Sequence, residues 1–411
     1  MLPLLSIVTH NWLATIALVI ALIGTASSTV FLGLVVVAAV RYQRRTVSAK
    51  TVSDDSSLPG VTLLKPVHGM EPRLFENLES FFKQDYPNFE ILIGARDVHN
   101  GALQVAQKVR EKYPNVVSRV VLSGPPSWPN AKVFSLDKMV RESDNSFFVI
   151  TDSDVVVEPD FLRRVIPPLL NPKTGLVTCL YRGIPAGDLW SLLEALGMSV
   201  ELPSGVLVAD MMEGMRFALG AVMAVRKDAL EKIGGIAATA DFYSDDFVLG
   251  NEVWKAGYVV ELSQPGIGHV LMPRSWKDSL GDQLRWMKST RYSRPLGHIG
   301  TGLTYAMPFG LLGLWAGFAI GIPLLGVSVF AATFFNRVLQ SVMVGGLILR
   351  DPQAVKYCWL YPVRDLLGFL TWAGSFTSRQ FHWRGELYKF GRGGRITPQH
   401  RPAESAVGEQ L

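Results

Sequence analysis

The chain has 411 residues, of which 48% are hydrophobic and 18% are charged, with a formal net charge of +5. So few charged residues are unusual for a soluble enzyme, and the apolar excess lies at the two ends, as expected for membrane spans. The only cysteines, Cys179 and Cys358, are too far apart for a redox or metal-binding motif and exclude a disulfide framework.

The N-terminal region predicts a membrane anchor. Residues 1–40 contain no Asp, Glu, Lys or Arg, and the apolar stretch at 12–40 exceeds the ~20 residues that cross a bilayer. A cleaved signal peptide would need a basic start and a shorter apolar core, so we expect a retained anchor. By the positive-inside rule, the basic residues that follow place the N-terminus outside and the next domain in the cytosol; these are Arg41, Arg44, Arg45 and Lys50. Anchor and polar linker together span 1–57.

Residues 58–294 are expected to form an α/β domain with a mostly parallel sheet. Strands are predicted at 61–66, 89–97, 116–122 and 147–151, and helices at 71–83, 101–113 and 132–142. Strands that alternate with helices of this size form right-handed βαβ units. Ligands of such sheets bind at the carboxyl ends of the strands.

Two carboxylates directly follow the apolar strand 147–151. Asp152 and Asp154 cannot be buried without a partner, because desolvating a charge is too costly. They therefore predict a divalent cation, Mn²⁺ or Mg²⁺, that holds a diphosphate. The alternative is a solvated turn, since Asp-x-Asp is common by chance. Asp97 ends another predicted strand, so it should lie on the same rim.

No glycine-rich phosphate loop follows the first strand, so a nucleotide diphosphate would need another counter-charge. Lys132, at the start of the helix that precedes the strand at 147–151, could contact a phosphate or could be a solvated lysine at the start of a helix. The apolar stretch 189–212 predicts either a core helix or a surface that meets the membrane and the acceptor.

A second membrane region is predicted at 295–378. Spans are expected near 302–321 and 324–349, with a break at 321–323. Arg337 falls inside the second span, so its side chain should face protein or snorkel.

A third apolar stretch, 357–378, is interrupted by Arg364 and Asp365. It is either a crossing or a re-entrant or interfacial helix. The basic tail, 379–411, favours the cytosol and therefore an even number of crossings after the α/β domain.

Several short motifs occur in a characteristic order. They lie at 64–69, 77–87, 97, 130–132, 151–154, 220–227, 244–247, 284–286 and 383–388. In this order the chain resembles the ceramide glucosyltransferases, membrane-anchored inverting glycosyltransferases with a GT-A, Rossmann-like nucleotide-sugar-binding domain. It is also similar to the bacterial hopanoid-associated glycosyltransferases of the same branch.

On the donor side, the resemblance implies contact of Asp97 with uridine. It implies that Asp152 binds the donor and that Asp154, with Asp152, ligates the metal. Lys132 lies in one of the matching motifs.

On the acceptor side, the resemblance implies that Asp246 is the general base and that Arg285 and Trp286 lie near the acceptor and the diphosphate. The family has Gln or Arg three residues before Arg285, whereas this chain has Asp282, followed by Gln283. Any role of that first motif position is therefore in doubt.

Together these features predict a metal-dependent integral membrane enzyme that transfers a hexose from a UDP-sugar to a lipid hydroxyl. Glucose and ceramide are the expected substrates. The alternative within this class is a hopanoid or polyprenoid acceptor with UDP-N-acetylglucosamine. A non-catalytic membrane scaffold is a different class, and retention of all three aspartates speaks against it.

Overall fold

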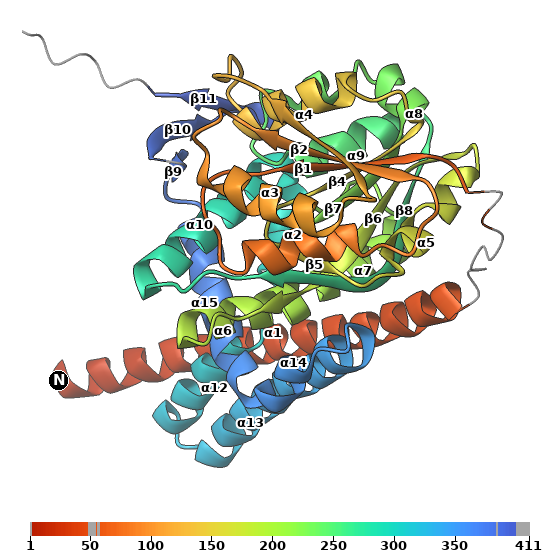
Figure 1. Cartoon of the computed structure of the whole chain (residues 1–411). Coiled ribbons are helices and arrows are strands. Elements are labelled where there is room, and N and C mark those ends of the chain that lie inside the picture. Colours follow the sequence, from red (N-terminus) through yellow and green to blue (C-terminus); the bar gives the residue numbers. More distant parts are fainter. Residues whose placement is uncertain (1, 48–54, 56–57, 384, 400–411) are drawn as a thin grey trace, which may run out of the picture.

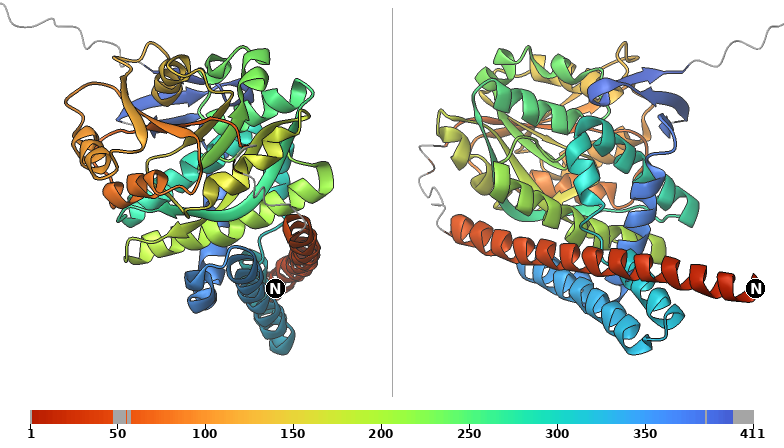
Figure 2. Two further views of the ribbon diagram at one scale, coloured as in Figure 1. Left: turned by 45° about the vertical axis from the view of Figure 1, so that its right-hand side comes forward. Right: turned by 180° about the vertical axis from the view of Figure 1, so that it is seen from behind.

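The computed structural model describes residues 2–47, 55, 58–383 and 385–399 (Figure 1). Most of the predicted linker, Lys50, and residues 384 and 400–411 of the predicted tail lie outside the described residues. An α/β domain lies on one side of a group of apolar helices, and α1 runs beneath this domain, beside α12 and α13 (Figures 1 and 2).

The domain is built on one eight-stranded sheet, in the order β3-β2-β1-β4-β7-β6-β8-β5. Its strands are β1 (Val61–Pro66), β2 (Phe89–Ala95), β3 (Val117–Leu122), β4 (Phe147–Thr151), β5 (Val155–Val157), β6 (Thr174–Ile184), β7 (Val222–Arg226) and β8 (Val259–Val270). Only β5 and β7 run against the other strands of this sheet, so the predicted mostly parallel α/β fold is confirmed.

Helices cover both faces of the sheet. They are α2 (Leu74–Phe82), α3 (Gly101–Lys112), α4 (Ala131–Arg141), α5 (Phe161–Val165), α8 (Lys227–Lys232), α9 (Asp245–Lys255) and α10 (Trp276–Ser293). Phe148 and Ile150 of β4 belong to one hydrophobic core, and Val149 belongs to the core on the opposite face. The apolar run before Asp152 is therefore a strand, as predicted, and it is buried on both faces.

The apolar stretch after β6 lies between the sheet and the membrane helices (Figure 1). It consists of α6 (Leu189–Leu196), a π-helical turn η3 (Gly197–Glu201) and α7 (Leu202–Glu213). Its length and composition would allow a span, but 67% of its most apolar window is buried inside the protein. The core-helix interpretation thus describes most of this stretch.

Helix α1 (Leu2–Val47) is long and apolar enough to cross a membrane between Trp12 and Arg45, as the sequence predicts. Its last turns bind the α/β domain. The Tyr42 hydroxyl donates to the Ser263 carbonyl at 2.6 Å, and Arg45 forms a 3.0 Å ion pair with Asp210 of α7. Anchor and domain are therefore joined by polar contacts.

The second membrane region differs from the prediction in one segment. Its helices are α11 (Pro295–Thr301), α12 (Met307–Ala319), α13 (Pro323–Gln340), η5 (Ser341–Ile348), α14 (Pro352–Lys356) and α15 (Tyr361–Gly374). The break at 321–323 is confirmed, since Gly321 has φ 79° and Pro323 begins α13. Residues 323–348 are long enough to span, but the span predicted at 302–321 contains only a 13-residue helix because turns occupy 302–304.

Arg337 faces protein, as expected. Its side chain is 2% exposed and forms a 3.1 Å ion pair with Asp365 of α15, which is equally buried. Asp365 also accepts hydrogen bonds from the amides of Ala306 and Met307, at the start of α12. Asp365, one of the two charges that interrupt the third apolar stretch, thus holds three helices together.

The predicted basic tail begins with a folded element, a three-stranded antiparallel sheet. Its strands are β9 (Gln380–Trp383), β10 (Glu386–Phe390) and β11 (Ile396–Pro398). The Ile396 amide donates to the Asp241 carbonyl of the α/β domain at 2.8 Å, so both lie on the same side of a membrane. Helix α15, with 14 residues or about 21 Å, is short for a crossing, which favours the re-entrant or interfacial alternative.

Candidate active site

A lysine and two aspartates connect the carboxyl end of β4 with the start of α9. Asn130 caps α4 by accepting a hydrogen bond from the Lys132 amide, which places Lys132 in the first turn. The Lys132 Nζ atom lies 2.6 Å from Asp152 Oδ1 and 3.6 Å from Asp245 Oδ2. Burial opposes ionisation of Asp152, but the Lys132 ammonium outweighs it and keeps the pKa of Asp152 below its ordinary value.

A second lysine lies beneath this cluster, at the end of β1. Lys65 is fully buried; its Nζ atom donates to the Asp152 carbonyl at 2.5 Å and lies 3.8 Å from the centre of the Phe81 ring. Burial lowers the pKa of Lys65 to about 7. The turn that carries Asp152 and Asp154 is thus fixed from below by a side chain that the sequence analysis did not single out.

Asp154 faces a histidine from a distant strand. Strand β5 pairs with β8 in an antiparallel register that places Val155 opposite His269, and His269 Nε2 lies 3.4 Å from Asp154 Oδ2. Asp154 Oδ1 and His269 Nδ1 are buried and have no hydrogen-bond partner in the described part of the chain. The unpaired carboxylate oxygen of Asp154 suits a cation such as Mn²⁺, and the imidazole beside this carboxylate is a second potential ligand.

The described residues contain no group of three or more His, Cys, Asp or Glu side chains arranged to hold a metal ion. Asp154 and His269 therefore form at most part of a ligand set. Mg²⁺ and similar ions often bind through one or two carboxylates, with substrate phosphates and water as further ligands. The residues present fit a metal that binds together with a diphosphate.

Asp246 has the environment of a general base. It lies in the first turn of α9, where the Phe247 amide donates to its Oδ1 at 2.8 Å. A methyl group at Gly220 would lie 3.1 Å from its Oδ2, so the glycine leaves room for this carboxylate. Burial and the neighbouring Asp245 raise the pKa of Asp246 to about 7.

Arg285 is held on α10 by two partners. Its Nε donates to the Tyr243 hydroxyl at 2.7 Å, and its Nη1 lies 2.7 Å from Asp282. Asp282 also forms a 3.0 Å ion pair with Arg274. The departure from the family motif therefore places a carboxylate between two guanidinium groups. The next residue along the helix, Trp286, is 36% exposed.

Asp97 is exposed, at the edge of the sheet where β1 and β4 also end. Its Oδ1 accepts a hydrogen bond from the His99 amide at 2.9 Å. No hydrogen bond or ion pair within the described ranges joins Asp97 to the other carboxylates. The structure brings Lys132, Asp152 and Asp245 into contact, whereas Asp97 contacts the amide of His99.

Comparison with known proteins gives a consistent result. The model of glycosyl transferase family 21 matches residues 18–396. Ceramide glucosyltransferase 3 of Caenorhabditis elegans is 23% identical over 356 residues, which cover 84% of this chain and 76% of the relative. Ceramide glucosyltransferase of Komagataella phaffii is 34% identical over 124 residues, 29% of this chain and 24% of the relative.

Two solved structures with similar folds were also found. A mannosyltransferase from Pyrobaculum calidifontis, in complex with GDP-Man and Mn²⁺, is 18% identical, with a TM-score of 0.47; the match covers 85% of this chain and 98% of that chain. Staphylococcus aureus TarS, in complex with UDP-GlcNAc, is 13% identical, with a TM-score of 0.39; the match covers 83% of this chain and 99% of that chain.

Proposed function

The chain belongs to glycosyl transferase family 21, and on that premise we propose that it transfers glucose from UDP-glucose to the primary hydroxyl of ceramide with inversion. It is a glycosyltransferase that acts on a lipid. The names of its relatives support ceramide as the acceptor. The long apolar helices support delivery of that acceptor from a membrane.

One observation carries the proposal: Asp246 is a partly buried carboxylate beside a second carboxylate, with its pKa raised to about 7. A base with such a pKa is ionised in half of the molecules at neutral pH and still accepts a proton readily. Asp246 takes the proton of the acceptor hydroxyl as that oxygen bonds to the anomeric carbon. The bond from the anomeric carbon to the diphosphate oxygen breaks, and UDP leaves with its electron pair.

The leaving diphosphate needs positive charge. Arg285, which Asp282 and Tyr243 hold in place, and Lys132 provide it from the protein. Asp154 and His269 are the residues that would hold Mn²⁺ or Mg²⁺, with Asp152 adjacent, and the cation would stabilise the negative charge that develops on UDP. Asp97 contacts the uridine and Trp286 stacks on the acceptor.

Two basic segments support a cytosolic active site. Arg41, Arg44 and Arg45 end the part of α1 that could span the membrane, and Arg379 lies beside the small C-terminal sheet. Both segments adjoin the α/β domain, so the positive-inside rule assigns that domain to the cytosol.

The test is a UDP-release assay on the detergent-solubilised full-length protein. UDP-glucose and UDP-N-acetylglucosamine are each offered with ceramide or with a polyhydroxylated hopanoid, with and without Mn²⁺. Turnover with UDP-glucose and ceramide supports the proposal. Turnover only with the hopanoid would support glycosyl transfer but contradict ceramide as the acceptor. Turnover that does not depend on metal would contradict the proposed role of a cation. Asp154→Ala should raise the Mn²⁺ concentration needed for half-maximal rate.

A further inference from the structure

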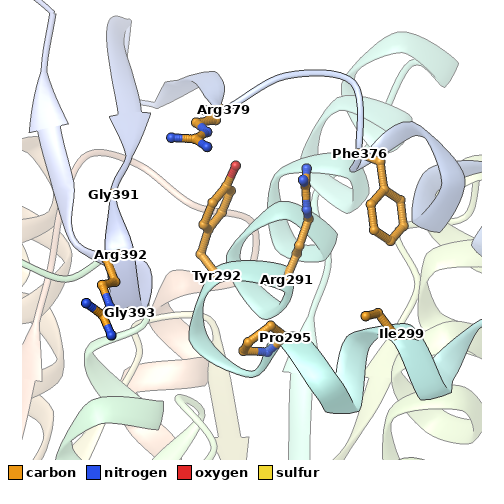
Figure 3. Close-up of a pocket in the computed structure, with 9 residues that line it drawn as sticks. All are labelled: Arg291, Tyr292, Pro295, Ile299, Phe376, Arg379, Gly391, Arg392 and Gly393. Carbon is orange, nitrogen blue, oxygen red and sulfur yellow. The ribbon is translucent and has the colours of Figure 1, made fainter.

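A pocket of about 500 Å³ lies beside the C-terminal end of α10 (Figure 3). Its walls come from α10, α11, the segment after α15 and the turn after β10. The lining residues are Arg291, Tyr292, Pro295, Ile299, Phe376, Arg379, Gly391, Arg392 and Gly393. None of them belongs to the site proposed for glycosyl transfer.

The polar wall of this pocket is positively charged. Arg291, Arg379 and Arg392 line it without any acidic neighbour in the lining. No carboxylate of a described residue lies within ion-pair distance of these three guanidinium groups. Arg291 is fixed by a 2.8 Å hydrogen bond to the Ser375 carbonyl and by the face of Phe376, at 4.7 Å.

A tyrosine hydroxyl without a hydrogen-bond partner also indicates that this pocket binds an anion. The Tyr292 ring stacks on Phe390 at 5.4 Å, which fixes its direction. Its hydroxyl oxygen is buried and lacks a hydrogen-bond partner among the described residues. In Figure 3 this hydroxyl points toward Arg379. A phosphate oxygen near Arg379 would accept its hydrogen bond and would satisfy a polar atom that is otherwise buried unpaired.

The other wall is apolar and leads toward the membrane helices. Ile299 and Phe376 are 57% and 42% exposed. Leu296 of α11 and Leu303, in the turn after α11, are also strongly exposed and continue the apolar surface toward α12, which begins at Met307. Exposed apolar side chains next to a transmembrane region are typical of a surface that contacts acyl chains.

We propose that this pocket binds the phosphate of an anionic membrane phospholipid, whose acyl chains lie along α11. Guanidinium groups match phosphate in both charge and hydrogen-bond geometry. A free phosphate or soluble phosphometabolite would use the arginines and Tyr292, but would leave Leu296, Ile299 and Leu303 in water. The apolar wall therefore selects the lipid over the soluble anion.

The test measures lipid binding to the delipidated full-length protein in detergent by native mass spectrometry. Dioleoyl phosphatidylglycerol should bind at least tenfold more tightly than dioleoyl phosphatidylcholine. The double variant Arg379→Gln/Arg392→Gln should lose that preference, because it removes two of the three guanidinium groups in the pocket. Both side chains are exposed, so their replacement should leave the fold intact. Equal binding of the two lipids, or an unchanged preference in the double variant, would overturn the proposal.

The matched control is Arg395→Gln, between β10 and β11 but outside the pocket lining. Arg395 is paired with Asp241 at 2.7 Å, and its variant should bind phosphatidylglycerol like the wild type. An equal loss of lipid preference in this control would mean that binding depends only on the overall positive charge of this region. The proposed phosphate site would then be wrong. The last experiment adds inorganic phosphate as a competitor of the lipid. If millimolar phosphate displaces the lipid completely, the pocket binds a soluble anion instead. Since the readout is binding, these results do not depend on the glycosyltransferase substrates.

Discussion

The Lys132 ammonium lies 2.6 Å from Asp152 and 3.6 Å from Asp245, and so joins the turn after β4 to the first turn of α9. One ammonium group thereby connects Asp152, the carboxylate proposed to bind the donor, with Asp245, the neighbour of the proposed general base Asp246. Lys132 is largely buried, so its charge acts in an environment where screening by water is weak.

Replacing Lys132 should affect both stability and turnover. Lys132→Gln leaves two partly buried carboxylates without their cation, so we expect only part of the about 3–5 kcal/mol that breaking a fully buried pair typically costs. We expect a clear drop in the melting temperature and a rise in KM for the UDP-sugar. Thermal unfolding and UDP release measure these effects. Lys138→Gln, an exposed lysine on the same helix, is the control and should behave like the wild type.

The pH profile should follow the ionisation of Asp246. Its pKa is raised to about 7, so below pH 7 the carboxyl is protonated and cannot accept the acceptor's proton. We expect kcat/KM to fall about tenfold per pH unit below this value and to level off above it. Asp245→Asn removes one cause of the raised pKa, so the break should move to lower pH. A break that stays in place in this variant would show that another group titrates.

Gly220 provides a test of space beside the base. A Cβ atom there would lie 3.1 Å from Asp246 Oδ2, closer than ordinary van der Waals contact. Gly220→Ala should lower kcat about tenfold or more, since small displacements of catalytic groups are costly, while the melting temperature changes little. Gly281→Ala on α10, where no atom lies within 4 Å, should keep full activity. Full activity of Gly220→Ala would contradict the position assigned to the Asp246 carboxylate.

The buried ion pair between Arg337 and Asp365 should be essential for the membrane region. Asp365→Ala leaves Arg337 unpaired and removes the acceptor for two α12 amides, with an expected loss of about 3–5 kcal/mol. The double variant Arg337→Met/Asp365→Leu should be less destabilised, because neither charge of this pair remains buried without its partner. Thermal unfolding in detergent compares them. Equal stability of Asp365→Ala and the wild type would argue against this pairing.

Local patterns predicted the first half of the domain well. The strands β1–β4 and the helices between them follow from short apolar runs and helical periodicity, so their order and direction could be expected. The same holds for the break at 321–323 and for the protein-facing side chain of Arg337. The helix predicted at 302–321 is shorter than expected, because composition does not show where turns shorten a helix.

Contacts between distant segments were not predictable. His269 faces Asp154 only because β5 pairs with β8, more than 100 residues along the chain. Asp365 appeared as an obstacle to membrane crossing, and its buried partner could not be identified without the packing of α13 against α15. The one sequence feature that could have indicated a role for Lys65 is its place in a short apolar strand. That feature does not show which carbonyl the ammonium contacts.

The most direct test of the proposed chemistry compares wild type and Asp246→Asn in one glycosyl-transfer reaction, with product analysis by NMR. UDP-glucose and ceramide are supplied to the full-length protein in detergent. We expect the wild type to release UDP and β-glucosylceramide in equal amounts. The variant should be folded, bind UDP and lose about 10²- to 10⁴-fold in rate, as is typical when a general base is removed. An α-linked product, or an unchanged rate in Asp246→Asn, would contradict inverting transfer with Asp246 as the base.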